Sequence, residues 1–508
     1  MERKWWTLLV VCISIFMLLL DITVVNVALP AIQRDLDADF SHLQWVVDAY
    51  ALMLAALLLT AGSLADRFGR RTVFSGGLVL FVLASLFCGL STSPTMLDIA
   101  RGLQGIGGAA MFATSLALLA QEFEGKERAN AFAIWGATTG LGVAIGPLVG
   151  GALVDGIGWE WIFFINIPIG AACTWISLTK VRETRDPSQG GVDFPGVITF
   201  SIALFCLVFA LIRGNSEGWS SALIVTLFIA SAVFFVAFVL AERRVSNPMF
   251  ELSLFRKPTF TGASIVAFTL SASMFAMFLY ITLYLQNVLD YSAFDAGLRF
   301  LPLSLLSFVA AAVSGRLSER LPTRWFMGAG LLFVSGGLLL MHGVTTDSEW
   351  TTLLAGFILA GVGIGMVNPP LASTAIGVVR PQQSGMASGI NTTFRQVGIA
   401  TGIAALGALF QSRVESSLQG TPVGQSGRAG QLAEAIASGG SKQAIQGAPP
   451  QMRGQIQDAA NQAFVAGFND ILLVAVGIAL FGAIAAVVLV HKRDFHTAAA
   501  PEQAPAAA

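Results

Sequence analysis

The chain has 508 residues, of which 55% are hydrophobic and only 12% are charged, whereas an ordinary soluble domain carries about 25% charged residues. This composition excludes a water-soluble enzyme, and at about 20 apolar residues per membrane span the length allows roughly fourteen spans. The formal net charge of −1 leaves no electrostatic footprint for nucleic acid. No lysine is followed by Ser or Thr, as a nucleotide-binding loop requires. The four cysteines lie far apart in apolar runs, so neither a metal site nor a cofactor is expected.

Apolar runs between charged or Gly/Pro-rich breaks predict the membrane-spanning helices in chain order. They lie near residues 7–30, 43–64, 72–92, 95–119, 130–154, 160–179, 194–212, 220–241, 259–287, 293–315, 323–344, 351–377, 385–410 and 468–490. Most of the 29 basic residues fall in every second connection, beginning with Arg3 and Lys4 at the N-terminus. By the positive-inside rule, this pattern predicts that both termini are cytoplasmic.

A short sequence repeat divides the chain into parts. The segment 62–71 recurs at 315–324, with Gly, Leu, an acidic residue, Arg and a final Arg at the same offsets. Both copies lie on the same predicted side, which favours two parallel six-helix halves at 1–190 and 246–495 with a two-helix insertion at 191–245. Within the second half, 411–466 is predicted to form an external loop, and the tail 496–508 to be disordered. The expected fold class is an all-α integral membrane protein.

Ionisable residues inside the predicted spans are few, and such residues are candidates for function. At a rise of about 1.5 Å per residue, Asp21, Asp48 and Arg101 lie at a similar depth below the outer face. We expect Asp21 to carry a proton, Arg101 to be its charge partner, and Asp48 to be a second titrating site or a cation-recognition site. The alternative is a permanent ion pair between Asp21 and Arg101, with Asp48 wetted in the outer vestibule.

Arg395 lies in the middle of the predicted span 385–410, where the second half offers no acid at comparable depth. Backbone carbonyls, an anionic group of a substrate, or an acid across the domain interface are its candidate partners. The alternative role is that of a structural hydrogen-bond anchor.

The span 130–154 carries Gly142, Gly146 and Gly150 at intervals of four residues, so they line one helical face. Such a face lets another helix approach closely, and Pro147 removes a backbone donor and can bend the helix. A helix of the second half is the expected partner, and plain close packing is the alternative.

Aromatic side chains in the span 259–287 are candidates for substrate contact, because ring faces attract flat cations. They are Phe275, Phe278, Tyr280 and Tyr284. The alternative for all four is packing in the core.

Together these motifs resemble the major facilitator superfamily, specifically its fourteen-span drug:proton antiporter branch of the multidrug-resistance-protein-B type, over residues 7–490. The segment 62–71 is similar to its motif A, 97–109 to the motif associated with proton coupling, 142–151 to the antiporter motif, and 20–30 to the signature of the branch. The resemblance implies that Gly62, Asp66, Arg67, Gly69, Arg70 and Arg71 act in gating, and it adds Asn26 and Gln104 as candidates for the substrate cavity. The second copy departs from motif A with Glu319 for Asp and Pro322 for Gly.

The resemblance implies a proton-coupled antiporter, not an enzyme, that exports amphipathic drugs or toxic compounds across the plasma (bacterial inner) membrane by alternating access. Its expected partners are small-molecule substrates, protons and membrane lipid, without nucleotide or nucleic acid. A periplasmic adaptor assists some members of the family and is a candidate partner. The alternatives are a dedicated exporter of one metabolite, such as an antibiotic or siderophore, and a non-transporting membrane sensor.

Overall fold

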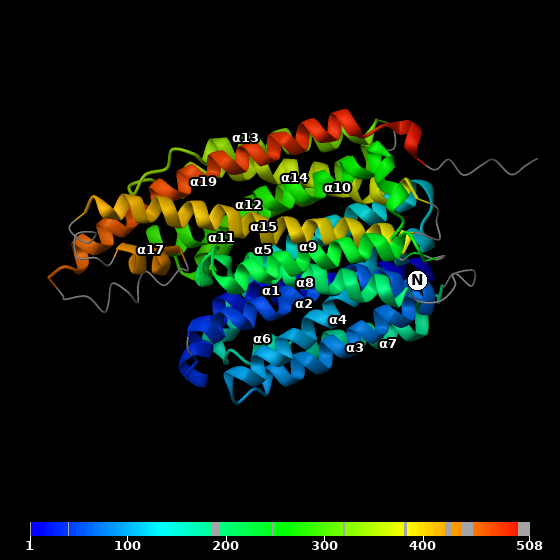
Figure 1. Cartoon of the computed structure of the whole chain (residues 1–508), viewed down its shortest axis with the longest axis horizontal. Helices are drawn as coiled ribbons and strands as arrows, with labels where there is room; N and C mark the ends of the chain where they lie inside the picture. Colours follow the sequence, from blue (N-terminus) through cyan, green and yellow to red (C-terminus); the bar gives the residue numbers. More distant parts are fainter. Residues whose placement is uncertain are drawn as a thin grey trace, which may run out of the picture.

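The computed structural model describes residues 2–38, 40–184, 193–245, 248, 250–318, 321–379, 384–421, 429–437 and 451–495. Within these ranges the regular structure is helical (Figure 1). The predicted tail 496–508 and Glu319 of the second motif copy lie outside the described residues, and so do the side chains of Asn26 and Pro147.

The helices follow the predicted spans one by one. The first part of the chain forms α1 (Arg3–Leu36), α2 (Phe40–Phe68), α3 (Arg70–Gly89), α4 (Pro94–Glu122), α5 (Gly125–Gly156), α6 (Trp161–Phe164) and α7 (Asn166–Lys180). The short α6 and α7 together make the sixth span. The next two spans are α8 (Phe194–Glu217) and α9 (Ala222–Glu242).

The second half begins with a composite span in which two π-helical turns, Ser271–Phe275 and Tyr284–Val288, interrupt α10 (Pro258–Leu270) and α11 (Ala276–Leu283). It continues with α12 (Ala293–Leu317), α13 (Thr323–Met341), α14 (Thr351–Gly377), α15 (Ser384–Gln419), α17 (Ala429–Ala437) and α19 (Arg453–Leu489). The predicted loop 411–466 is therefore shorter than expected, because α15 and α19 extend into it from both sides.

Thirteen helical stretches among the described residues are long and apolar enough to cross a membrane. Helix α5 occupies the place of the remaining predicted span, between α4 and the α6–α7 pair. The chain is thus an all-α, multi-pass membrane protein whose helix order matches the expected fourteen-span plan.

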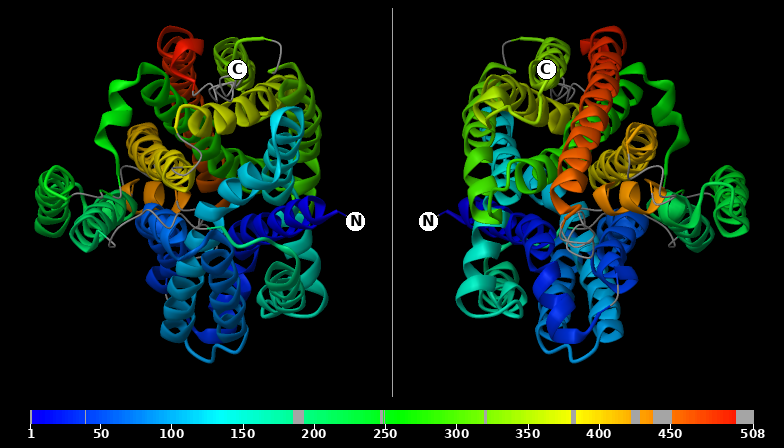
Figure 2. Two further views of the ribbon diagram at one scale, coloured as in Figure 1. Left: turned by 90° about the vertical axis from the view of Figure 1, so that its right-hand side faces the viewer. Right: turned by 90° about the vertical axis from the view of Figure 1, so that its left-hand side faces the viewer.

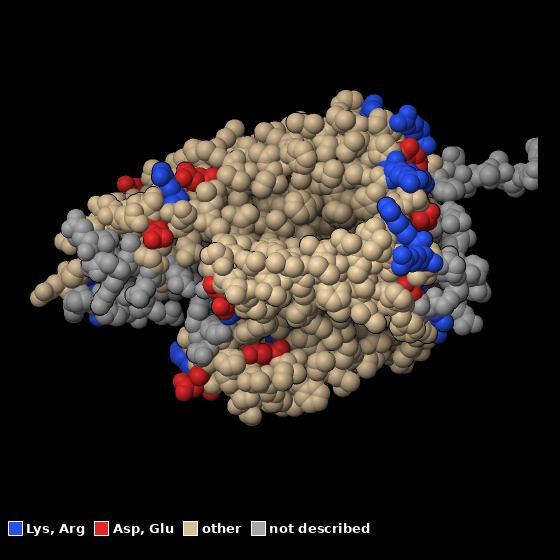
Figure 3. Space-filling view, viewed as in Figure 1, with Lys and Arg blue, Asp and Glu red and all other residues tan. Residues whose placement is uncertain are grey.

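Basic side chains gather at one end of the molecule, where the N-terminus also lies (Figures 1 and 3). We call this the basic end, and the opposite one the distal end. Several of these side chains bind carbonyls where helices end: Arg3 Nε donates to Lys180 O (3.0 Å), Arg128 Nη2 to Ala120 O (2.7 Å) and Lys257 Nζ to Val378 O (2.9 Å). These cations stabilise the negative ends of the helix dipoles at the basic end.

Glycines let helices cross closely at equivalent places in the two halves. A Cβ atom on Gly107 of α4 would lie 2.7 Å from the backbone N of Phe81 in α3. A Cβ atom on Gly363 of α14 would lie 2.7 Å from the backbone N of Val334 in α13. The third and fourth helices of each half are therefore held together by the same device.

The glycine face of α5 packs against α1. A Cβ atom on Gly142 would lie 3.1 Å from Leu19 Cβ, one on Gly150 would lie 3.2 Å from Val24 O, and one on Gly146 would collide with the Thr23 hydroxyl. The expectation that this face meets a second-half helix is wrong, because α1 is the helix whose backbone approaches where α5 lacks side chains. Helix α12 also packs on α5.

The second half repeats this contact between its first and fifth spans. A Cβ atom on Gly398 of α15 would lie 3.0 Å from Phe268 Cα in α10, and one on Gly402 would lie 2.7 Å from Ala272 Cα in the π-helical turn that follows. The helix contacts therefore recur in the order that two parallel halves require.

Helices α8 and α9 pack on each other and lie at one side of the bundle (Figure 2). Helix α8 contacts both α2 and α15, which belong to different halves, and the hydroxyls of Thr60 in α2 and Ser201 in α8 are 2.9 Å apart. Helix α9 exposes Ile229, Val233 and Val236 by about 60% each. Apolar exposure of this kind suits a helix that faces lipid.

We predict that Gly146→Ala lowers the stability of the protein by about 1–3 kcal/mol, because the added methyl group overlaps Thr23 in a close-packed contact. The measurement is the thermal unfolding midpoint of the protein purified in detergent. Gly156→Ala on the same helix, with no atom within 4 Å of its new Cβ, is the matched control. Adding Thr23→Ala to Gly146→Ala should restore only part of the loss, because the Cβ atom of residue 23 would still lie 2.6 Å from the new methyl group. Equal midpoints for the two glycine variants would contradict the packing argument.

Candidate functional site

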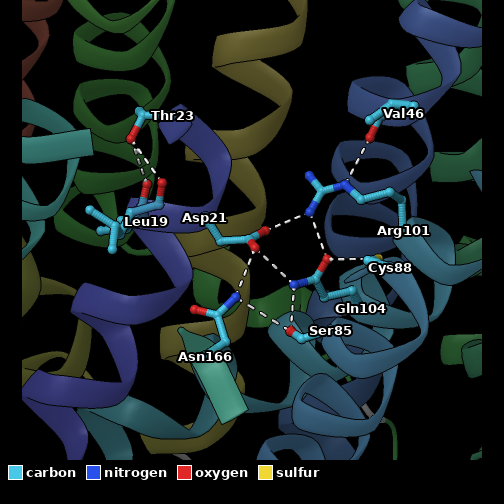
Figure 4. A network of polar contacts seen from close by, with 10 residues as sticks. Leu19, Asp21, Thr23, Val46, Ser85, Cys88, Arg101, Gln104 and Asn166 are labelled. Atoms are coloured by element: carbon cyan, nitrogen blue, oxygen red, sulfur yellow. Dashed lines mark hydrogen bonds and ion pairs between the residues drawn. The ribbon is translucent and has the colours of Figure 1, made fainter. Parts of the chain in front are cut away.

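An acid and a base from different helices meet inside the first half (Figure 4). Arg101 Nη1 of α4 lies 2.5 Å from Asp21 Oδ2 of α1, and both side chains are 1% exposed. Arg101 Nε also donates to the carbonyl of Val46 in α2 at 2.8 Å, and the guanidinium lies 4.4 Å from the centre of the Tyr50 ring. The structure thus brings Asp21 and Arg101 together at the centre of this half, as a buried ion pair.

Neutral polar groups complete the site around the second carboxylate oxygen. Gln104 Nε2 and Asn166 Nδ2 donate to Asp21 Oδ1 at 2.9 and 3.0 Å, and Gln104 Nε2 also donates to Ser85 Oγ at 2.8 Å. Gln104 Oε1 accepts from Arg101 Nη1 at 2.6 Å. Gln104, a candidate for the substrate cavity, is instead fully buried in this network, with hydrogen bonds at both amide atoms.

Sequence reasoning did not assign Ser85 or Asn166 to this site. Both are fully buried or nearly so, and they come from α3 and α7, so that residues of five helices form the network around Asp21. Asn166 begins α7 directly after the short α6, and this break in the sixth span is the one signal that could have pointed to it. A polar residue at a helix break inside the membrane usually serves a buried site.

The chemistry available to this site is proton exchange. Moving an isolated charge out of water costs several kcal/mol, and here Arg101 and the amide donors offset that cost for Asp21. A carboxylate held in this way can take up a proton only when water reaches it or Arg101 moves away. The arrangement can therefore couple protonation to a change in helix positions.

Asp48 does not join this network. It lies on α2 and interacts electrostatically with Arg213 of α8. Arg213 in turn pairs with Glu217 at 2.8 Å and lies 5.7 Å from the centre of the Trp45 ring. Asp21 thus pairs with Arg101, whereas the charge partner of Asp48 is Arg213 in the inserted helices.

The motif at the end of α2 ties the two halves together at the basic end. Arg70 donates to Asp66 Oδ1 from Nε at 2.9 Å and from Nη2 at 2.8 Å, and both side chains are buried. The second oxygen, Asp66 Oδ2, accepts from the backbone N of Met386 at 3.0 Å. Met386 lies in the first turn of α15, so Asp66 caps the positive end of a helix from the other half.

Glu183 holds the start of α3 beside this contact. Its carboxylate accepts from the backbone N of Arg71 at 3.1 Å and of Thr72 at 3.0 Å, which are free donors at the helix N-terminus. Gly69 precedes the helix with φ +109°, and a Cβ atom there would collide with the Glu183 carboxylate. Glu183 is a residue of this cluster that sequence reasoning missed, since it lies more than a hundred residues further along the chain.

The other residues of this motif make no contact with the second half among the described interactions. Gly62 is buried within α2. The guanidinium of Arg67 lies 5.4 Å from the centre of the Phe68 ring, and Arg71 Nε lies 3.6 Å from Glu183 Oε2.

The two tyrosines proposed for substrate contact are core residues, so that prediction is wrong for them. Tyr280 is 3% exposed and donates to Ile403 O at 3.2 Å, whereas Tyr284 is fully buried and stacks on Phe468 at 5.3 Å. Both lie on the face of their helix that packs against α15 and α19, which explains their burial.

Phe275 and Phe278 are only partly buried and contact each other at 5.5 Å between ring centroids. Phe278 also contacts Phe300 of α12 at 5.7 Å. Their role at a substrate cavity stays a prediction.

Arg395 meets α14 near the boundary between the halves. Its Nη1 donates to Asn368 Oδ1 at 2.9 Å, and Asn368 Cβ lies 3.5 Å from the place of a Cβ atom on Gly136 in α5. Pro369 cannot bond the carbonyl of Gly365, which instead accepts from Ser314 Oγ of α12 at 3.0 Å. Among the described residues, Arg395 thus bonds the neutral side chain of Asn368, beside the point where Pro369 interrupts the hydrogen bonds of α14.

Known proteins are similar to this chain in sequence and in fold. The model of the Major Facilitator Superfamily matches residues 11–403. The chain belongs to this superfamily. It is 37% identical over 415 residues to the multidrug resistance protein Stp of Mycobacterium tuberculosis, covering 81% of this chain and 77% of that one. It is 33% identical over 515 residues to the tetracenomycin C resistance and export protein of Streptomyces glaucescens, covering 99% and 94%.

Two solved structures show the same fold as this chain. The human organic anion transporter MFSD10 superposes with a TM-score of 0.63 at 15% identity over 96% of this chain and 100% of that one. A bacterial homologue of the human lysosomal transporter Spinster gives a TM-score of 0.57 at 18% identity over 98% and 99%. This chain is accordingly a membrane transporter of the major facilitator superfamily.

We predict that Glu183→Ala destabilises the protein by about 1–2 kcal/mol, since it removes the acceptor for two free N–H groups at the start of α3. Glu124→Ala is the control, because Glu124 precedes α5 without a capping bond from its side chain. Thermal unfolding in detergent compares the two, and a loss no greater than that of the control would show that Glu183 does not support the helix.

Proposed function

We propose that this transporter exports amphipathic drugs or antibiotics across the bacterial inner membrane in exchange for protons. The single observation that carries the proton coupling is the buried Asp21, paired with Arg101 and supported by Gln104 and Asn166. Drug export is supported by the relatives, whose names describe multidrug resistance, antibiotic resistance and antibiotic export.

The coupling follows from competition for Asp21. When Asp21 takes up a proton, Arg101 loses its counter-ion but keeps the Val46 carbonyl and the Tyr50 ring on α2. The electrostatic tie between α1 and α4 weakens, so the two helices can separate and admit substrate or solvent. Loss of the proton on the other side restores the pair and closes the site, which is the alternation that transport requires.

The gate is proposed to act at the basic end. We propose that this end, with both termini, lies in the cytoplasm, because basic side chains gather there and the positive-inside rule assigns such an end to the cytoplasmic face. Asp66 connects α2 to the start of α15, so the described conformation has its cytoplasmic side held closed. Opening inward requires Asp66 to leave the N-terminus of α15, where Arg70 remains to hold the charge.

Arg395 is proposed to recognise an anionic or strongly hydrogen-bond-accepting group of the substrate. Its guanidinium bonds the neutral Asn368, and one turn earlier the Asn391 amide nitrogen is buried without a hydrogen bond. Residues four apart share a helix face, so both donors line the same side of α15.

Export of one dedicated antibiotic is the second candidate function. It is favoured by the relatives named for tetracenomycin C and for puromycin. The breadth of compounds that move protons in the experiment below separates the two candidates.

Asp21→Asn should abolish proton-driven export, because an amide cannot exchange a proton at this site. The measurement is dissipation of an imposed pH gradient in proteoliposomes on addition of ethidium, puromycin or an anthraquinone dye. Exchange of labelled for unlabelled compound without a gradient should persist, which shows that the protein is folded. Asp347→Asn, an exposed acid at the distal end, is the control, and full proton-driven transport by Asp21→Asn would refute the assignment.

Arg395→Leu should reduce transport of compounds that carry a carboxylate or phenolate about tenfold to a hundredfold, which corresponds to the loss of a hydrogen bond to a charged group. Lipophilic cations should be affected much less. Competition by both classes against transport of one fluorescent compound measures the difference. Gln396→Leu, the next residue, is the control, and an equal loss for anions and cations would assign Arg395 a structural role.

A further inference from the structure

A second acid and base, both partly buried, meet at the distal end of the first half. His42 Nδ1, near the start of α2, lies 2.6 Å from Asp98 Oδ2, near the start of α4. This pair is outside the network of Asp21, although Asp98 lies in the segment 97–109 that resembles a motif of the family. A histidine bonded to a carboxylate can pass protons between its two ring nitrogens.

The His42–Asp98 pair lies on the same faces of α2 and α4 as the Arg101 contact, one turn closer to the distal end. Asp98 and Arg101 are three residues apart on α4, and His42 and Val46 are four apart on α2, so each pair shares one helix face. Val46 accepts from Arg101, and both helices run from the distal to the basic end. The His42–Asp98 pair thus lies one helical turn, about 5 Å, outward of the Arg101 contact.

Solvent exposure falls along this line of groups. The side chain of His42 is 36% exposed and that of Asp98 is 15% exposed, whereas Arg101 and Asp21 are each 1% exposed. The imidazole therefore reaches water, and the carboxylate lies between it and the closed network.

Other charged groups surround the distal end of these helices and contribute to the field at His42. They are Arg34, Asp35 and Asp37 at the end of α1, Asp48 on α2, Glu160 before α6, and Arg213 and Glu217 at the end of α8. Several of these have partners of their own: Asp35 accepts from Trp159 Nε1 at 3.0 Å, and Arg213 pairs with Glu217 at 2.8 Å.

We propose that His42 and Asp98 form the proton entry relay that loads Asp21 from the distal, external side. This inference rests on the proposed proton coupling and on the proposed orientation. In the relay, His42 takes up a proton at Nε2 from an external hydronium ion and, as the imidazolium, gives its Nδ1 proton to Asp98 Oδ2. Asp98 then passes the proton inward to the Asp21 carboxylate when Arg101 swings away. His42 regains its starting tautomer when its remaining proton moves from Nε2 back to Nδ1 through water.

The test compares His42→Gln, Asp98→Asn and the conservative Asp98→Glu in proteoliposomes of uniform orientation. Dissipation of an imposed gradient is recorded with ethidium, puromycin and an anthraquinone dye while the external pH is varied around the ordinary histidine pKa of about 6.5. Substrate–substrate exchange at equal pH is measured in parallel, because it needs binding and helix movement but no net proton uptake. His342→Gln and Asp347→Asn, exposed residues at the distal end of the second half, are the matched controls.

With the wild type and both controls, we expect proton uptake to increase as the external pH falls. His42→Gln and Asp98→Asn should weaken that dependence and slow uptake roughly tenfold to a hundredfold, as expected for loss of an acid–base group, with substrate exchange unchanged. Asp98→Glu should recover part of the rate.

Three results would overturn the relay. One is an unchanged pH profile in His42→Gln. Another is an equal loss of exchange and proton uptake, which would make the pair a structural clasp between α2 and α4. The third is an absence of proton movement with the wild type, which would refute the proposed function itself and the relay with it.

Discussion

The first half of the molecule is organised around one charge pair in a place where charges are costly. Asp21 and Arg101 are both 1% exposed, and each offsets part of the cost of burying the charge of the other. Their pairing fixes the mutual position of α1 and α4, and the remaining carboxylate oxygen requires donors from Gln104 and Asn166. The packing around the pair is close for the same reason, since a Cβ atom on Gly105 would collide with the backbone of Tyr50, the residue whose ring covers Arg101.

Much of the fold could be predicted from the sequence, because hydropathy and the placement of basic residues are local properties of the chain. The helices of the structure follow the predicted spans, and Asp21 and Arg101 could be matched because so few charges lie at that depth. Partners set by helix rotation could not be found in this way. The spacing of the glycines in α5 predicted a contact face, but it could not identify α1 as the partner helix. The aromatic pattern of Tyr280 and Tyr284 fits a substrate cavity as well as a packed core.

Contacts between residues distant in sequence were also beyond prediction. Glu183 reaches the start of α3, and Met386 offers a backbone N–H to Asp66 across 320 positions. Neither has a sequence signal, since a glutamate after a span and a methionine in a helix are ordinary residues there. His42 directly precedes the predicted span 43–64, and its pairing with Asp98 depends on the parallel course of α2 and α4.

The position of α8 has a mechanical consequence for the inserted helices. Among the described residues, its polar and charged contacts with the two halves are made to α2, through Thr60 and Asp48, whereas Val208 of α8 and Ala400 of α15 belong to one apolar cluster. Apolar surfaces slide over one another more readily than bonded ones separate. We expect the insertion to move with the first half during transport, and α15 to move along α8 at this apolar contact.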